Sequence, residues 1–288
     1  IIKGSKMLTK LKYKLWKHLN KQFTNNKVEQ NLEFLNNIVQ NINNTTINAV
    51  DTAKQLMIGV NVDIVEKLLK INEVNVAIFQ YLTGIEFNKD FVKEREIVFN
   101  PQNTPPDHYK RYCFARDRLK SSEIVLDCAC GCGYGSSVLA QSAGKVIGID
   151  LEPNVINFAS KVFRKDNLQF IAQDAQNLTI NETFDALITF ETIEHIPHPE
   201  IFLKSVFPHL KQKGKIFCSV PNEHCCPFNL SGNSFHMRHY TSEQFQKLIT
   251  DAGFSIDEIH GQNFSNGSEI NDFDDKNSNV IIIVAHKP

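Results

Sequence analysis

Hydrophobic residues recur in two different patterns along this chain, and the first pattern lies in its N-terminal third. From Val28 to Val60, apolar side chains recur at the a and d positions of successive heptads, with Thr46 as the one polar member. That spacing predicts a long helical segment with a coiled-coil seam. We therefore expect a helical arm over residues 1–86. It either associates with copies of itself or closes on itself as a hairpin through Gly59.

The segment before the seam has a different character. Between Met7 and Phe23, five lysines interleave with leucines, a tryptophan and a phenylalanine. This pattern predicts a basic amphipathic helix. Such a helix packs its apolar stripe on its own protein or lies on an anionic membrane surface, so peripheral membrane contact is an alternative use of the arm.

The second pattern begins at Glu123, where short apolar runs are separated by segments long enough for helices. Seven runs predict strands: Ile124–Cys128, Lys145–Asp150, Leu168–Ala172, Ala186–Phe190, Lys215–Val220, Phe254–Ile259 and Val280–Ala285. Alternating strands and helices predict a parallel sheet. No helix separates the last two runs, so we expect them to form a hairpin and add an antiparallel strand. The expected catalytic domain is residues 122–288.

Residues 87–121 connect the two patterns. They contain Pro101, Pro105 and Pro106, which interrupt regular structure, and then a short helix candidate from His108 to Arg118. This order predicts a linker followed by a lid over the sheet.

Composition narrows the class of protein. The 288 residues are 42% hydrophobic and carry a formal net charge of −1, which disfavours a surface built for nucleic acid. Seven cysteines, an odd number in a chain too long to need disulfides, indicate a reducing compartment, so we expect a cytoplasmic protein. The longest wholly apolar run, Val280–Ala285, is far below the ~20 residues of a membrane-spanning helix, and no signal peptide is recognisable.

A glycine turn follows the first strand and carries the candidate chemistry. Its spacing is G-x-G-x-G at Gly131, Gly133 and Gly135, with Asp127 at the strand end. A carboxylate there repels a pyrophosphate but suits a ligand with an ammonium and a sulfonium, as in S-adenosylmethionine. Asp150 ends the next strand, where an acid binds ribose hydroxyls, so an adenosine ligand is expected.

These motifs, with Gln173-Asp174-Ala175 and Phe184-Asp185-Ala186 further along the chain, resemble class I S-adenosylmethionine-dependent methyltransferases, similar to the ubiquinone-type O-methyltransferases. The stretch from Glu94-Arg95 through Pro105, followed by His108-Tyr109-x-Arg111-Tyr112-x-Phe114-Ala115, is similar to the sugar and polysaccharide-cluster methyltransferases. The resemblance implies an α/β Rossmann-like doubly wound sheet with a C-terminal antiparallel strand, preceded here by the α-helical arm. It also implies a set of cofactor-binding residues: Asp127, Ala129, Gly131, Gly133, Asp150, Leu151, Asp174, Ala175 and Phe190.

After the fourth strand stands the pattern E-x-x-E-H, formed by Glu191, Glu194 and His195. On a helical turn, residues at i, i+3 and i+4 face one point, and two carboxylates with an imidazole suit a divalent metal. The pattern resembles the metal-binding motif of ubiquinone-biosynthesis O-methyltransferases and small-RNA ribose methyltransferases. It is also common in related methyltransferases without a known metal, so both interpretations stay open.

The loop from Pro221 to Tyr240 supplies a further candidate, His236. Loops above the sheet edge set acceptor specificity, and a histidine with a near-neutral pKa suits a general base. We therefore expect His195, His236 and Glu191 as catalytic residues. The expected reaction is O-methylation of a saccharide or other small hydroxylated acceptor. The alternatives are a quinone or aromatic acceptor, or a cofactor-binding pseudo-enzyme whose arm assembles a complex.

Overall fold

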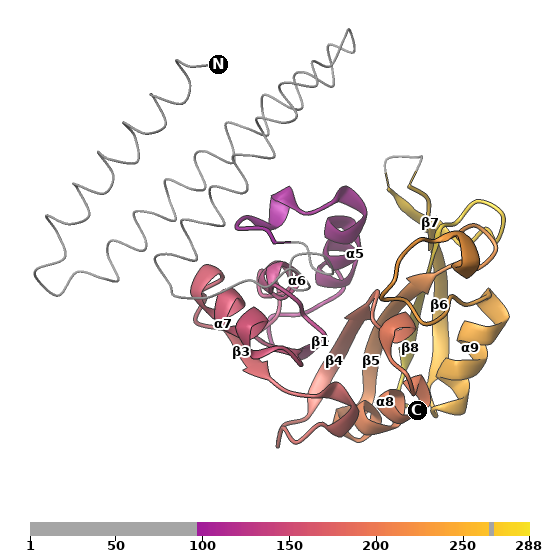
Figure 1. Cartoon of the computed structure of the whole chain (residues 1–288). Helices are drawn as coiled ribbons and strands as arrows, with labels where there is room; N and C mark the ends of the chain where they lie inside the picture. The colour runs from indigo at the N-terminus through magenta and orange to yellow at the C-terminus, as the bar shows by residue number, and fades with distance from the viewer. Residues whose placement is uncertain (1–96, 265–267) are drawn as a thin grey trace, which may run out of the picture. The chain divides into compact units, whose positions relative to one another are not determined.

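The computed structural model describes residues 97–264 and 268–288 (Figure 1). The predicted helical arm, with its heptad seam and its basic segment, lies outside the described residues, as does the start of the linker. Self-association and membrane contact through the arm therefore stay predictions. Within the two described ranges, no helix is both long and apolar enough to cross a bilayer.

Eight strands form a single sheet with the order β3-β2-β1-β4-β5-β8-β6-β7. The strands are β1 Ile124–Cys128, β2 Lys145–Asp150, β3 Leu168–Ala172, β4 Phe184–Phe190, β5 Leu210–Pro221, β6 Ser255–Gln262, β7 Ile270–Asp272 and β8 Val280–His286. The first five pair in parallel, which confirms the prediction from their alternation with helices.

The C-terminal strands are antiparallel, as predicted, and the structure adds their arrangement. β8 inserts between β5 and β6 and runs antiparallel to both. The short strand β7, which the sequence did not predict, pairs with the end of β6. Because β6 runs in the same direction as β5, its carboxyl end at Gln262 reaches the edge where the parallel strands end.

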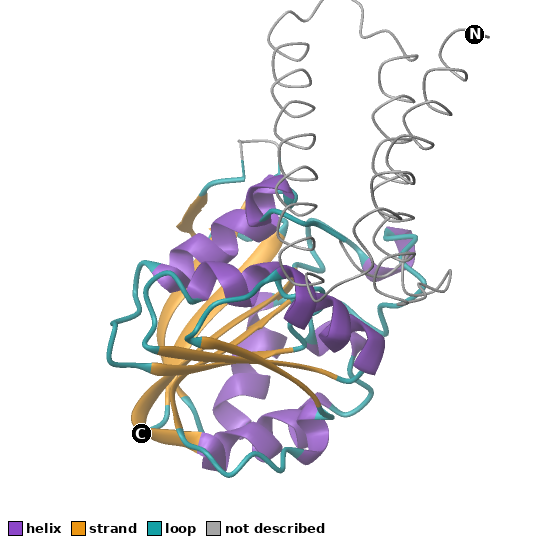
Figure 2. Cartoon of the chain, turned by 90° about the vertical axis from the view of Figure 1, so that its left-hand side faces the viewer, coloured by secondary structure: helices purple, strands orange, loops and turns teal. Residues whose placement is uncertain are grey.

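Helices cover both faces of the sheet (Figure 2). They are α5 Pro106–Arg116, α6 Tyr134–Leu139, α7 Pro153–Val162, α8 Pro199–Val206 and α9 Ser242–Asp251. Successive strand residues point to opposite faces, so Val125 packs in the core under α5 and α6 while Leu126 packs in the core under α8 and α9. Burial on both sides explains why the central strands are almost wholly apolar.

Local signals in the sequence set the helix boundaries near the site. Thr241 caps α9 through a capping box with Gln244. The predicted lid helix is α5, which begins after Pro105 with Pro106 at its first turn. Short 3-10 turns lie between these elements: η1 Pro101–Asn103, η2 Ala175–Asn177, η3 Ile193–His195, η4 Phe207–His209 and η5 Phe228–Leu230.

Candidate functional site

The glycine turn between β1 and α6 is held in an unusual backbone conformation. Ala129, Gly131 and Gly133 have positive φ values of 56°, 53° and 85°. At Gly133 a Cβ would lie 2.7 Å from the Ala159 Cβ, so glycine is needed there for packing. At Gly131 a Cβ would have open space, and this residue lines a cavity at the carboxyl edge of the sheet. The two glycines therefore have different roles.

Asp150 locks this turn to the end of β2. Its Oδ2 accepts a hydrogen bond from the Gly131 backbone N–H at 3.1 Å, and its Oδ1 accepts one from the Glu152 N–H at 3.0 Å. The side chain is almost fully buried yet reaches the cavity. A carboxylate fixed by two backbone donors keeps its remaining lone pairs aimed in one direction.

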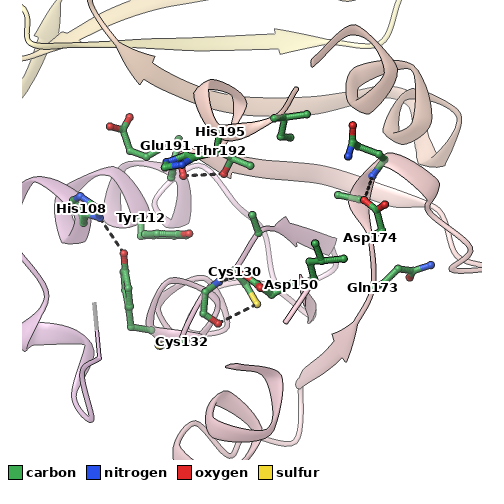
Figure 3. A pocket seen from close by; sticks show the side chains of 18 of the residues that line it. His108, Tyr112, Cys130, Cys132, Asp150, Gln173, Asp174, Glu191, Thr192 and His195 are labelled. Carbon is green, nitrogen blue, oxygen red and sulfur yellow. Dashed lines mark hydrogen bonds between the residues drawn. The ribbon is translucent and has the colours of Figure 1, made fainter. Parts of the chain in front are cut away.

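The cavity has a volume of about 320 Å³ and extends from β3 to β4. Figure 3 shows Gln173 and Asp174 on one side of it, Cys130 and Asp150 below, and His108 and Tyr112 on the opposite side. Seven of the nine predicted cofactor-binding residues line it: Ala129, Gly131, Asp150, Leu151, Asp174, Ala175 and Phe190. The Asp174 side chain caps η2 by accepting from the Gln176 N–H at 2.8 Å.

Asp127 departs from the expectation that it points into the site. Its side chain is fully buried, and it accepts hydrogen bonds from the Ser136 hydroxyl at 2.6 Å and the Tyr112 hydroxyl at 3.3 Å. Burial raises the pKa of the Asp127 carboxyl to about 7, against the effect of these two hydrogen bonds. Asp127 thus ties the lid helix α5 to α6, and it does not line the cavity.

The helical turn expected for E-x-x-E-H does not form as predicted. Glu191 has a left-handed φ of 48°, and only Ile193–His195 forms a 3-10 turn. The Glu191 carboxylate accepts a hydrogen bond from the Ser219 hydroxyl at 2.8 Å. The side chain lines the cavity but does not join the cluster of possible metal ligands around Glu194 and His195. The left-handed residue breaks the helical spacing on which the prediction depended.

A different third residue joins Glu194 and His195, and it is His236. Ligand atoms of these three side chains lie within 4.8 Å of one another, the one group among the described residues able to hold a metal ion. The Nε2 of His195 lies 3.9 Å from Oε1 of Glu194, and the His195 and His236 rings meet edge to face at 4.6 Å. The structure therefore brings together two predicted catalytic residues, His195 and His236, with the metal candidate Glu194.

The histidine tautomers follow from the hydrogen-bond partners. The Nδ1 of His239 faces the Cys226 carbonyl, which only accepts, so that nitrogen carries the hydrogen. The Nε2 of neutral His239 then accepts from the Nδ1 of His236 at 2.7 Å. The His195 Nδ1 faces the Phe235 carbonyl at 3.2 Å. In the neutral forms, both His195 and His236 consequently present an unprotonated Nε2.

Electrostatics favour the neutral imidazole of His236. Burial, followed by the neighbouring His195 and His239, lowers the pKa of His236 to about 4. Glu194 is fully buried, and neither of its carboxylate oxygens has a hydrogen-bond partner among the described residues. Burial, with the charge of Glu191 as the second cause, holds the pKa of Glu194 well above its usual range. An unpartnered buried carboxyl beside two imidazole lone pairs is a donor set suited to a divalent cation.

The helix α5 contributes cavity residues that were not predicted as site residues from the sequence. His108, Arg111 and Tyr112 all line the cavity. The Nδ1 of His108 lies 3.1 Å from the Tyr134 hydroxyl. Burial, and secondly the charge of Arg111, lowers the pKa of His108. The i, i+3, i+4 spacing of these residues in a segment placed directly before the glycine strand is the signal that could have identified them.

Comparisons with known proteins agree with this geometry. Residues 119–260 match a family described as a methyltransferase domain. The chain is 33% identical to a ubiquinone biosynthesis O-methyltransferase of Coxiella burnetii over 34% of its own length and 43% of that protein. It is 30% identical to a phosphoethanolamine N-methyltransferase of Triticum aestivum over 51% of its length and 28% of that protein. The chain thus spans less than half the length of either relative.

A solved structure shows the same fold. An N-methyltransferase from Bradyrhizobium japonicum, in complex with S-adenosyl-L-homocysteine, aligns with a TM-score of 0.51 at 15% identity. The alignment covers 65% of this chain and 90% of that one.

Proposed function

We propose, from the premise that residues 119–260 are an S-adenosylmethionine-dependent methyltransferase domain, that this protein methylates a hydroxyl group of a small acceptor. The observation that carries the proposal is the continuity of one cavity. It runs from the glycine turn and Asp150, at one end, to His195 at the other. The names of the relatives support a small acceptor, because both describe methylation of small molecules.

The residues around the glycine turn fit the methyl donor. Asp150, Asp174 and Ala175 line the cavity, and in the proposed complex Asp150 would accept from the ribose hydroxyls while Asp174 and Ala175 would lie beside the adenine. Among the described lining residues, Arg111 is the one with a permanent positive charge, and it lies on α5, away from Asp150 and Asp174. A pyrophosphate at this turn would meet carboxylates without a nearby cation, so a dinucleotide fits less well. When bound, S-adenosylmethionine supplies a methyl group on a positively charged sulfur.

The acceptor end would hold a divalent cation through Glu194, His195 and His236. A cation there would lower the pKa of a hydroxyl next to it and compensate the buried carboxylate. The Cys226 and Phe235 carbonyls orient the imidazoles, which is the usual support for metal-binding histidines. Without a cation, His195 is placed to accept the proton of the acceptor hydroxyl, which is the second way this site can assist the reaction.

The side chains that line the cavity then act mainly by positioning the acceptor. Tyr112 packs edge to face on Phe190 and Tyr134, and this aromatic wall closes the middle of the cavity beside the glycine turn. Such a wall excludes water and restricts the approach of the acceptor toward one line.

Two measurements test the proposal. Calorimetry with S-adenosylhomocysteine should detect binding, and a methyl-transfer assay with sugars, catechols and quinols should detect turnover. Binding without turnover on any acceptor would favour the pseudo-enzyme that assembles a complex.

The metal is tested separately. Excess chelator should suppress turnover, and magnesium or manganese should restore it. Calorimetry with manganese chloride should show binding to the wild-type chain and to a Glu200→Gln control, whose side chain is exposed at the surface, but not to Glu194→Gln. Full activity in excess chelator would leave His195 as a base and Glu194 as a structural residue.

A further inference from the structure

His239 is a buried histidine beside the acceptor end, in the loop that precedes α9, and it does not line the cavity. Phe228 packs edge to face against its ring, with the ring centroids 5.6 Å apart. Both ring nitrogens have a partner: Nδ1 pairs with the Cys226 backbone carbonyl, and Nε2 lies 2.7 Å from Nδ1 of His236. A buried imidazole with both nitrogens paired has one orientation, so it can impose an orientation on the ring next to it.

The Cys226 carbonyl sets the direction of these hydrogen bonds. A carbonyl oxygen only accepts, so Nδ1 of His239 carries a hydrogen. Neutral His239 then has its lone pair at Nε2, and this lone pair accepts the Nδ1 hydrogen of His236. His236 is thereby held as the tautomer whose own lone pair is at Nε2. If His239 carried both protons, it would donate to His236 instead, and the His236 hydrogen would be on Nε2.

Other contacts hold the loop on both sides of His236. The Phe235 carbonyl faces Nδ1 of His195 at 3.2 Å, and the Met237 N–H donates to the Glu194 carbonyl at 2.9 Å. The position of the loop therefore depends on contacts of the residues that flank His236. The orientation and tautomer of the His236 ring depend on the hydrogen bond between the two imidazoles.

We propose that His239 is a positioning residue that holds His236 as the Nδ1–H tautomer, with the lone pair at Nε2 available to a divalent cation. This inference rests on the proposed function of the acceptor end, where His236 lies with Glu194 and His195. An imidazole binds a metal ion only through an unprotonated nitrogen. The partner that fixes the tautomer of a metal-binding histidine typically contributes about 10- to 100-fold in metal affinity.

Nitrogen-15 NMR of the metal-free full chain, labelled at histidine, tests the tautomer directly. Protonated and unprotonated ring nitrogens differ in chemical shift, and loss of signals in His236→Gln assigns this ring. At about pH 8, above the usual pKa of histidine, wild-type His236 should carry its hydrogen on Nδ1. In His239→Phe, which has no acceptor, part of the His236 population should move the hydrogen to Nε2. A wild-type ring protonated at Nε2, or a tautomer unchanged in His239→Phe, overturns the proposal.

A conservative variant separates the hydrogen bond from simple packing. The amide oxygen of His239→Gln can accept the Nδ1 hydrogen of His236, so this variant should keep the wild-type tautomer. His239→Asn retains an amide that can donate to Cys226 but is too short to reach His236, so it should behave as His239→Phe. If His239→Phe fails to fold, judged by circular dichroism, the asparagine variant decides the matter, and an unchanged tautomer in it overturns the proposal.

Calorimetry with manganese chloride measures the consequence for the site. Affinity should fall by about 10- to 100-fold in His239→Phe and by about threefold or less in His239→Gln. His209→Phe makes the same change directly before β5, at the opposite edge of the sheet from the cavity, and should bind as wild type. Unchanged affinity in His239→Phe, or equal losses in the phenylalanine and glutamine variants, overturns the positioning role.

Failure of the proposed metal site would be distinguishable from failure of this inference. A wild-type chain that binds no manganese would overturn the metal site of the acceptor end. The tautomer of His236, measured without metal, would still decide whether His239 positions that ring.

Discussion

The two ends of the cavity differ in how their charges are satisfied. At the donor end, Asp150 and Asp174 already accept backbone hydrogen bonds at 2.8–3.1 Å. At the acceptor end, the Glu194 carboxyl is buried with no hydrogen-bond partner in the described chain. The donor end is thus complete as a scaffold, whereas the acceptor end holds a buried carboxyl that lacks a partner.

This difference indicates where specificity is decided. A site whose carboxylates are fixed by the backbone binds one ligand in one orientation and needs little from the rest of the chain. A site with unpaired buried polar groups discriminates strongly, because a wrong ligand leaves those groups without a partner. We therefore expect substitutions at the acceptor end to change turnover and acceptor choice, and substitutions at the donor end to change cofactor affinity.

The largest expected effect is at the acceptor end. His195→Ala should lower kcat by roughly 100-fold or more, since either a metal ligand or a base is lost. Affinity for S-adenosylhomocysteine should stay within about twofold, because this side chain is separate from the groups that hold the donor. Steady-state kinetics and calorimetry measure the two quantities. His198→Ala, at an exposed side chain nearby, is the matched control, and equal losses in both variants would contradict the assignment.

The corresponding change at the donor end is Asp150→Ala. Loss of a charge-assisted hydrogen bond to the ribose should weaken S-adenosylhomocysteine binding by about 1–3 kcal/mol. Calorimetry gives the affinity directly, with Asp117→Ala as a control at an exposed carboxylate. Unchanged affinity would remove Asp150 from the cofactor site.

A smaller effect is expected for the buried Asp127 carboxyl that ties α5 to α6. The pKa of Asp127 is about 7 in the folded protein, above its value in an unfolded chain. Its contribution to stability is present at low pH and is lost as the pH rises through 7, because the unfolded chain gives up this proton first. Asp127→Asn removes that dependence.

The difference in the free energy of unfolding between Asp127→Asn and the wild-type protein reports this pH dependence. The free energy of unfolding of Asp127→Asn minus that of wild type should rise by roughly 1 kcal/mol from pH 6 to pH 7, and should level off above. Urea unfolding at each pH gives both values. A difference that is flat with pH, or that falls, would show that Asp127 ionises normally in the folded protein.

The smallest expected effect is that of Asp174→Ala. The side chain caps η2, and a backbone contact to adenine can persist without it, so affinity for S-adenosylhomocysteine should fall by only about threefold. A loss as large as that of Asp150→Ala would mean that the Asp174 carboxylate itself binds the adenine amino group.

The sequence by itself determined the parallel sheet, the antiparallel C-terminal strands and the glycine turn after the first strand. These features depend on local signals, namely short apolar runs for buried strands and glycine where φ is positive. Local signals also predicted the lid helix α5, which starts at a proline. They missed β7, because a three-residue strand is too short to show alternation.

Only the tertiary structure decided the composition of the acceptor end. The left-handed backbone at Glu191 took that residue out of the expected cluster, and a histidine from a distant loop, His236, took its place. Arg111 likewise meets Gln262 across most of the chain. Periodicity describes which side chains share a face within one segment. The pairing of loops above a sheet edge depends on how the separate strands are ordered, which no single segment specifies.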